Sequence, residues 1–359
     1  MKRFLCVLLS AVSLFSALSV TAFAAEKDRA ATKKILARFD AFDADSDGKV
    51  ASSDALYILK AAIGIEEMPK NKSLDADGDG KVTTSDALKV LRCSLGIEDM
   101  FSSDEILEYL RTELNWVKSR KPGFQKTRVD TCTSMKVTVK GASSLNANME
   151  EYSEYLKRVK NYTESMKSIL LRDMTEEEYE KMIAQLDKSI AEAEQAKVPK
   201  ETKRTVQSGT SQHYYYFPVT QYTWSCKLTS ADVKDVSLVY QDGKITITVN
   251  MNNYSYDATT YPYESGQYSE RLKLPYGKVF DLPTYNTNSD TAFKAIWLKN
   301  GNVTVEIDAS TGGVINANYA YDYTVDIINK QKTATNNYSM TVKQVSKMSE
   351  NYVINPITD

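Results

Sequence analysis

Hydrophobic residues recur at helical spacing along the middle of the chain. A first stripe, from Ile106 to Val117, predicts a helix that is capped by Ser103. This helix should end before Pro122, because proline cannot continue the backbone hydrogen-bond ladder. A second stripe predicts a helix over about 145–171. Both helices have one apolar face, so each must pack against another element.

A capping box indicates a third helix. Thr175 and Glu178 have the spacing at which the side chain of each can accept a hydrogen bond from the backbone N–H of the other. This helix should run to about residue 197, before Pro199. Between the first two helices, alternation over 135–140 predicts a short strand. The polar segment 205–212 predicts a linker or a long loop.

Alternation with a period of two dominates the C-terminal part of the chain. Residues 245–251 alternate apolar and polar side chains, as a half-buried strand does. Asp242-Gly243 and Asn300-Gly301 predict hairpin turns before two strands. The region therefore predicts a mainly antiparallel sheet, with at least one helix covering its apolar face.

Tyrosine is concentrated in this sheet region, where 17 of the 23 tyrosines lie C-terminal to His213. Aromatic rings can stack on sugars, but tyrosine is also an ordinary strand residue. The stripe at Tyr319, Tyr321 and Tyr323 continues into apolar residues and predicts core positions. Better candidates for a ligand surface stand around Pro262: Tyr254, Tyr256, Tyr261 and Tyr263.

The N-terminus has the pattern of a signal peptide. Lys2 and Arg3 precede an almost uncharged run over 4–20, and Ala22-Phe23-Ala24 has the small residues that a signal peptidase requires. The apolar run is short for a membrane span, which needs roughly 20 apolar residues. We therefore expect a signal peptide at residues 1–24, no membrane span after its cleavage, and a secreted, extracellular protein.

An internal repeat is the strongest signal in the sequence. Residues 43–68 align with residues 75–100 without a gap, and 16 of the 26 aligned positions are identical. Each copy has acidic residues at loop positions 1, 3, 5 and 12 and a glycine at position 6, Gly48 or Gly80. A hard cation takes about six to eight oxygen ligands, and alternate positions of such a loop converge on one centre. The repeat therefore predicts two Ca²⁺ sites.

The expected metal ligands stand at equivalent positions of the two loops. The residue at position 7 would bind through its backbone carbonyl, so its side chain is unrestricted. At position 9 the first loop has Ala51, so a water must replace the side-chain ligand and the first site should be the weaker. The predicted ligands are Asp43, Asp45, Asp47, Lys49 and Asp54 in the first loop and Asp75, Asp77, Asp79, Lys81, Thr83 and Asp86 in the second.

A pair of EF-hands does not fit, because an EF-hand needs a helix before each loop. Only ten residues separate Gly64 from Asp75, and Pro69 lies among them. Apolar residues at helical spacing predict a helix after each loop, with Phe42 and Leu74 packed beneath these helices. The apolar positions are Leu56, Leu59 and Ile63 in the first copy and Leu88, Leu91 and Leu95 in the second.

A duplicated loop followed by one helix, with Asp-Ala-Leu where each loop ends, resembles a type I dockerin over about residues 40–100. The resemblance implies an all-α module of two calcium-loop and helix units with near two-fold symmetry. It also implies a partner, the cohesin domain of a scaffoldin or cell-surface protein. The family's recognition positions, loop positions 10 and 11 and a basic residue in the helix, correspond here to Ser52, Ser53 and Lys60 and to Thr84, Ser85 and Arg92.

Composition narrows the possible functions. At 359 residues, of which 42% are hydrophobic, the chain can form more than one folded unit. Its 45 Lys and Arg residues nearly balance 47 Asp and Glu residues, so no global charge attracts nucleic acid. The single histidine, His213, excludes a multi-histidine metal site and is expected at the surface or rim.

The cysteines leave two interpretations open. Four cysteines are too few for a disulfide scaffold. After signal cleavage, Cys132 and Cys226 are the pair outside the repeat. In a secreted protein they can form a disulfide, or they can be two isolated buried thiols. Cys93 lies at a helix position and is expected to pack as a small apolar residue.

Together these patterns predict an α+β protein. The dockerin-like module is followed by a helix-rich segment at 101–205 and a Tyr-rich antiparallel β region at 206–359, with one α+β domain over 101–359 as the alternative.

The function of residues 101–359 stays open between three classes. Dockerins accompany plant-wall-degrading assemblies, so plant polysaccharide is a candidate ligand and a polysaccharide hydrolase is the alternative to a noncatalytic binding or structural role. A protein-directed module is the third class. No catalytic residue is assigned, because the acidic residues of the sheet have no recognisable motif around them: Glu264, Glu270, Glu306 and Asp308.

Overall fold

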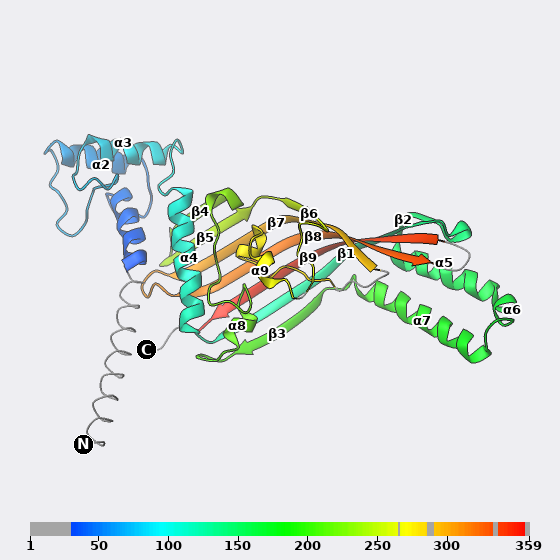
Figure 1. Cartoon of the computed structure of the whole chain (residues 1–359). Helices are drawn as coiled ribbons and strands as arrows, with labels where there is room; N and C mark the ends of the chain where they lie inside the picture. The colour runs from blue at the N-terminus through cyan, green and yellow to red at the C-terminus, as the bar shows by residue number, and fades with distance from the viewer. Residues whose placement is uncertain (1–29, 265, 286–290, 333–336, 356–359) are drawn as a thin grey trace, which may run out of the picture.

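One large antiparallel sheet organises the computed structural model, which describes residues 30–264, 266–285, 291–332 and 337–355 (Figure 1). Its strand order is β2-β1-β9-β8-β7-β5-β4, with β3 paired to β1 and β6 paired to β7. The predicted signal peptide at 1–24 lies outside the described residues. The strands are β1 (Phe124–Lys140), β2 (Ala147–Glu151), β3 (Lys200–Val206), β4 (Val233–Gln241), β5 (Lys244–Met251), β6 (Tyr254–Asp257), β7 (Thr291–Asp308), β8 (Val314–Lys332) and β9 (Asn337–Ile354).

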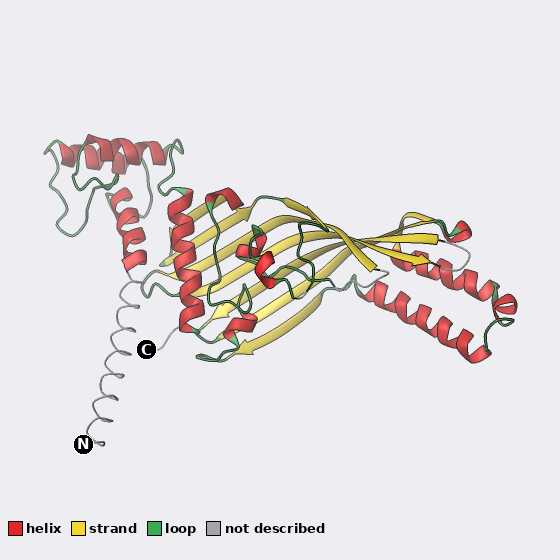
Figure 2. Ribbon diagram, in the orientation of Figure 1, coloured by secondary structure: helices red, strands yellow, loops and turns green. Residues whose placement is uncertain are grey.

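Helices cover one face and one end of this sheet (Figure 2). Helix α4 crosses the sheet near the end where the chain enters it, and the hairpin of α5 and α7 stands at the opposite end. The α+β class is therefore confirmed. A first helix covers residues 30–42. The helices that follow are α2 (Ser52–Ala62), α3 (Thr84–Ser94), α4 (Ser103–Arg120), α5 (Tyr152–Ser165), α6 (Lys167–Leu170), α7 (Glu176–Gln195), α8 (His213–Tyr216) and α9 (Tyr268–Arg271).

The alternating sequence pattern produces the inner face of the sheet. In β5, Ile245, Ile247 and Val249 are fully buried, whereas Thr246 and Thr248 are only half-buried on the opposite face. The inner face packs against the apolar side of α4 and against the irregular segments after β3 and β6. One continuous hydrophobic core results.

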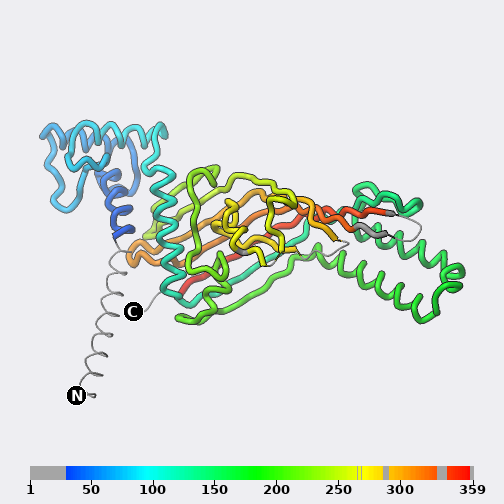
Figure 3. Tube along the Cα trace, in the orientation of Figure 1, coloured from blue at the N-terminus to red at the C-terminus, as the bar shows by residue number. Residues whose placement is uncertain are grey.

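The first and last parts of the sheet region lie side by side (Figure 3). Strand β1 pairs with β9 from Phe124 opposite Ile354 to Lys140 opposite Ser339. The predicted strand at 135–140 is only the end of β1, since pairing with β9 extends it over the whole element. Among the described residues, no helix is both long and apolar enough to span a bilayer.

Two local predictions in the helical part need correction. The long helix expected over about 145–171 is wrong at its start, because residues 147–151 form β2 against the far end of β1. Ser102, one residue before the predicted cap, caps α4, and its hydroxyl accepts a hydrogen bond from the Glu105 N–H at 3.3 Å. The helix capped by Thr175 and Glu178 is confirmed as α7.

Of the two predicted hairpin turns, one is confirmed and one is wrong. Asp242-Gly243 joins β4 to β5, with positive φ angles of 52° and 73°. Asn300-Gly301 instead lies inside β7, where the register with β8 shifts and the strand continues. Glycine is required at 301 because a Cβ atom there would lie 2.7 Å from the Tyr276 ring, whose hydroxyl accepts the Gly301 N–H.

Tyrosine fills the core of the domain. Tyr319 and Tyr321 are 1% and 2% exposed, which confirms that their stripe faces inward. The ligand surface expected around Pro262 is wrong, because those rings pack on each other and on the sheet. Tyr261 and Tyr263, for example, stack on Phe293 with centroids 5.3 and 5.1 Å away.

The sulfur and imidazole groups are also buried. Cys132 and Cys226 are free thiols, so the two-thiol alternative is confirmed and the disulfide is not formed. The placement of His213 at the surface or rim is wrong. Its ring is fully buried against Phe124, and its Nε2 hydrogen bonds with the carbonyl of Pro122.

We predict that His213 makes stability depend on pH. Burial lowers its pKa from the ordinary 6.5 to about 4, although the hydrogen bond with Pro122 opposes the shift. Between these values the unfolded chain binds a proton that the folded chain does not. The free energy of unfolding should therefore fall as pH falls below about 6.5, and His213→Gln should flatten this part of the profile.

Chemical denaturation at a series of pH values measures this effect. Because His213 is the only histidine in the sequence, one imidazole resonance reports its titration in the folded protein. Titration of that resonance near 6.5 would contradict the prediction.

Candidate functional site

The two acidic loops have the same backbone geometry. Gly48 and Gly80, at position 6, have φ angles of 84° and 86°, a region that favours glycine. Their N–H groups donate to Asp43 Oδ2 at 3.2 Å and to Asp75 Oδ2 at 2.8 Å. The first aspartate of each loop is thus oriented by the turn that glycine makes.

The last aspartate of each loop is buried and joins the loop to its helix. Asp54 accepts the N–H groups of Ala51 and Asp45 at 2.7 and 3.1 Å, at the start of α2. Asp86 does the same for Thr83 and Asp77 at the start of α3. Both carboxylates lie at the third helical position, where a negative charge is favourable.

These carboxylates form two clusters in which every candidate metal ligand is an oxygen atom. One carboxylate oxygen from each of Asp43, Asp45 and Asp54 lies within 4.8 Å of the others, and Asp75, Asp77 and Asp86 form the equivalent cluster. In the first cluster, Asp43 Oδ1 is buried without a hydrogen-bond partner. A calcium ion prefers such hard oxygen ligands, so the residues fit the ion.

The electrostatics of the first loop favour a bound cation. Burial raises the pKa of Asp54, and the carboxylates of Asp45 and Asp43 raise it further, while the two backbone N–H groups lower it. The ionised carboxylates therefore repel one another at neutral pH. A divalent cation between them would remove that repulsion.

The other predicted ligands lie around these clusters. The carboxylates of Asp47 and Asp79 accept the N–H groups of Lys49 and Lys81 at 2.9 and 2.8 Å. Neither aspartate belongs to the three-residue clusters. Thr83 caps α3 by accepting the Ser85 N–H. Their roles as ligands, and those of the Lys49 and Lys81 carbonyls, stay predictions.

Most of the apolar residues that predicted a helix after each loop face outward. Ile58 and Val90 are fully buried and pack with Phe42 and Leu74 beneath the two helices, as predicted for the last two. Leu91 is partly buried against this cluster. The outward residues, with their exposed fractions, are Leu56 (52%), Leu59 (36%), Ile63 (56%), Leu88 (49%) and Leu95 (63%).

The reason for this difference is the small size of the module. Each helix uses small residues on its inner face, such as Ala55 in α2 and Ala87 in α3, so that the two helices approach closely around Ile58 and Val90. The large leucines then have no room inside and remain exposed. Spacing alone cannot distinguish these two faces of an amphipathic helix.

The predicted recognition residues border this exposed apolar surface. Ser52 and Ser53 are exposed at the start of α2, and Thr84 and Ser85 at the start of α3. In α2, Lys60 lies 3.8 Å from Glu66, and in α3 its equivalent Arg92 lies 3.9 Å from Glu98. The structure therefore has two equivalent faces, each with hydroxyl groups, leucines and one cation. Sequence reasoning missed the leucines as surface residues.

The acidic residues considered for hydrolysis have other contacts. Glu270 pairs with Lys273 at 2.7 Å, and Glu264 is exposed. Asp308 accepts the Thr311 N–H at 2.8 Å and so stabilises the turn between β7 and β8. Glu306 lies on the outer face of the sheet, opposite Asn316.

We predict that two truncations in α2 change the free energy of unfolding by very different amounts. Ile58→Ala should reduce the free energy of unfolding of the module by about 2–5 kcal/mol, because it leaves a cavity in a fully packed core. Leu56→Ala should change it by no more than about 0.5 kcal/mol, because that side chain is half exposed. Denaturation of the full chain, followed by circular dichroism, compares the two. A larger loss for Leu56→Ala would contradict this orientation of the helix.

Comparison with known proteins identifies the module. Residues 41–92 match the model of one family, the dockerin type I domain. No curated protein and no solved structure matches the chain. Dockerin domains bind calcium and dock onto cohesins in cellulosome-type assemblies, which agrees with the two acidic clusters. The chain thus carries a type I dockerin domain near its N-terminus, at residues 41–92.

Proposed function

We propose that this protein is secreted and uses two bound Ca²⁺ ions to hold its dockerin module in a cohesin-binding form. The cohesin belongs to a scaffoldin or cell-surface protein of a polysaccharide-degrading assembly. Residues 101–359 are the cargo that this docking positions. The observation that carries the proposal is the pair of equivalent exposed faces, each directly attached to an acidic cluster.

The coupling between metal and docking surface is short. Asp54 lies next to Ser53 in the chain, and Asp86 lies next to Ser85. Each aspartate accepts backbone N–H groups from the loop while it stands in the first turn of the helix. A cation that fixes these carboxylates would therefore also fix the start of each helix, where the hydroxyl groups of the docking face are located.

We also propose that residues 101–359 form one α+β domain with a noncatalytic role in binding or structure. Its support is the pairing of β1 with β9, which joins the segment 101–205 to the C-terminal end of the chain in one sheet. The candidate carboxylates of a hydrolase give no support to catalysis, since Asp308 and Glu270 are engaged in a turn and an ion pair.

Calcium titration tests the first part of the proposal. The full chain, freed of metal by a chelator, should bind two Ca²⁺ ions and gain helix as measured by circular dichroism. Asp54→Asn and Asp86→Asn should each remove one ion, because each loses one charge in a cluster of three carboxylates. Asp99→Asn, an exposed position outside both loops, is the control. A stoichiometry of two in both loop variants would contradict these ligand assignments.

The equivalence of the two faces predicts redundant docking. Glutamate at Ser52 and Ser53 should reduce cohesin affinity only about twofold, because losing one of two equal binding modes costs about RT ln 2. The variant with glutamate at all four positions, Ser52, Ser53, Thr84 and Ser85, should not bind cohesin. Each unpaired charge buried in the interface costs on the order of 3–5 kcal/mol.

Calorimetry with the cognate cohesin measures both effects. The paired replacement Ser208→Glu and Ser211→Glu, at exposed positions outside the module, controls for added charge. Complete loss of binding in the Ser52 and Ser53 variant would show that one face alone docks.

A further inference from the structure

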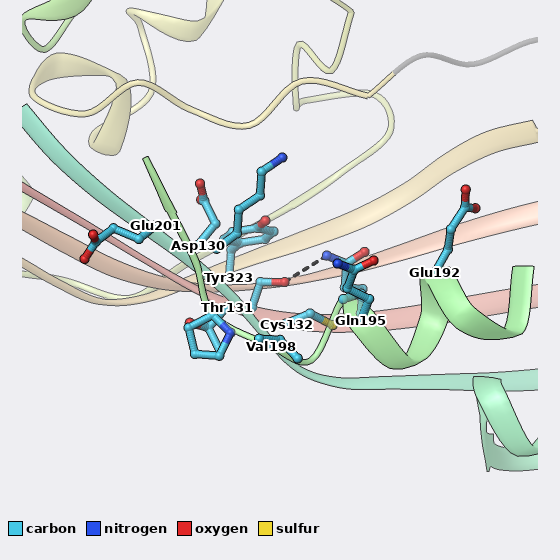
Figure 4. Close-up of a pocket in the computed structure, with 13 residues that line it drawn as sticks. Asp130, Thr131, Cys132, Glu192, Gln195, Val198, Glu201 and Tyr323 are labelled. Carbon is cyan, nitrogen blue, oxygen red and sulfur yellow. Dashed lines mark hydrogen bonds between the residues drawn. The ribbon is translucent and has the colours of Figure 1, made fainter. Parts of the chain in front are cut away.

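A cleft of about 660 Å³ opens where the helical hairpin meets the sheet (Figure 4). Its walls come from the C-terminal end of α7 and from the segment that leads into β3. Its floor is formed by the inner faces of β1, β8 and β9. The volume lies within the roughly 300–1,000 Å³ that is usual for ligand pockets.

The floor of the cleft is polar, and the charged residues Lys126, Arg128 and Glu350 lie on the same face of β1 and β9 beside it. Cys132 of β1 lies opposite Ser346 of β9, which lies opposite Tyr323 of β8, so the three form one row across the strands. Ser346 is 3% exposed and accepts a hydrogen bond from Gln344 Nε2 at 2.8 Å. The side chains of this row thus line the cleft with hydrogen-bonding groups that hold one another in place.

A partly buried charge network orients Asp130 on the floor of the cleft. The Arg128 guanidinium donates to both carboxylate oxygens of Asp130, at 2.6 and 2.9 Å. Its third nitrogen donates to Glu350 at 3.2 Å, and Glu350 is itself 4% exposed and held by Lys126 at 2.7 Å. The Asp130 carboxylate is thus held in place by Arg128, which Glu350 holds in turn. Proteins preorganise binding groups in this way.

The carboxylates that line the cleft are compensated by cations of the chain itself, and Lys200 lines the cleft beside them. Asp130 pairs with Arg128, Glu201 pairs with Lys203 at 2.8 Å, and Glu192 lies 3.9 Å from Lys188. These carboxylates also disfavour an anionic ligand. The neutral groups that remain, hydroxyls and amides, both donate and accept hydrogen bonds: Thr131, Gln195, Tyr323, Gln344 and Ser346.

We propose that this cleft binds an uncharged carbohydrate chain, with the Tyr323 ring and the Gln195 and Gln344 amides as its main contacts. The hydroxyl groups of a sugar donate and accept, as these amides do, and its apolar face suits an aromatic ring. The inference deepens the binding role proposed for residues 101–359 and rests on that role, but it does not depend on docking.

The test uses the full chain with Ca²⁺ and three probes, the β-linked hexasaccharides of glucose, xylose and mannose. Calorimetry should detect binding of at least one probe. Gln195→Ala, at an exposed position, should weaken it about two- to tenfold, the effect of one lost hydrogen bond, and Tyr323→Leu, which removes the ring, should weaken it at least as much. Gln185→Ala, which is exposed on the same helix outside the cleft, should leave affinity unchanged.

A second readout is the free thiol on the cleft floor. The bound probe should slow alkylation of Cys132 but not of Cys93, which lies in the dockerin module. The proposal is overturned if none of the three probes binds or if both cleft variants bind them as the unchanged protein does. Binding of oligolysine instead of the probes would also overturn it, because the cleft would then select positive charge. The double variant Asp54→Asn and Asp86→Asn distinguishes the two functions, because it should abolish docking through both faces and leave carbohydrate binding unchanged.

Discussion

The pairing of β1 with β9 is the constraint on which the domain depends. It brings together two segments that are about two hundred residues apart in sequence, from Phe124 opposite Ile354 to Cys132 opposite Ser346 and beyond. Without this contact, β1 would pair only with the shorter strands β2 and β3, and β9 would expose a long edge. The pairing also creates the cleft, since its floor row exists only when Cys132, Ser346 and Tyr323 lie on adjacent strands of one sheet.

The dockerin module follows a different principle, in which local geometry is sufficient. Glycine at position 6 and aspartate at positions 1, 3 and 12 of each loop lie within a dozen residues of one another. Their backbone hydrogen bonds, from Gly48 to Asp43 and from Ala51 to Asp54, are equally local. Such a module needs a cation more than a large core, because its core is small and its carboxylates repel.

These two principles explain which features the sequence could predict. The loops, α4, α7 and the β4–β5 turn depend on neighbours in sequence and were predictable. The length of β1 was not, because Lys126 and Arg128 look like surface residues until Glu350 of β9 pairs with both. The burial of His213 likewise results from Phe124 and Pro122, some ninety residues away. The outward leucines of α2 and α3 could not be assigned, because helical spacing is the same for either face.

The helix at residues 30–42 connects the two parts physically. Ile35 belongs to the large core around α4, whereas Phe42, two turns later, is fully buried in the core of the module. Between them Arg38 pairs with Glu105 of α4 at 2.9 Å, and Phe39 packs on Phe101 at 5.5 Å. The first acidic loop begins directly after this helix. A helix cannot bend freely without breaking its hydrogen bonds, so the first metal cluster is joined to the sheet domain by a helix that packs on α4. The second loop reaches the same domain by another path, through α3 and the segment with Met100 and Phe101 that leads into α4. The two docking faces are therefore equivalent within the module but not relative to the domain that it carries.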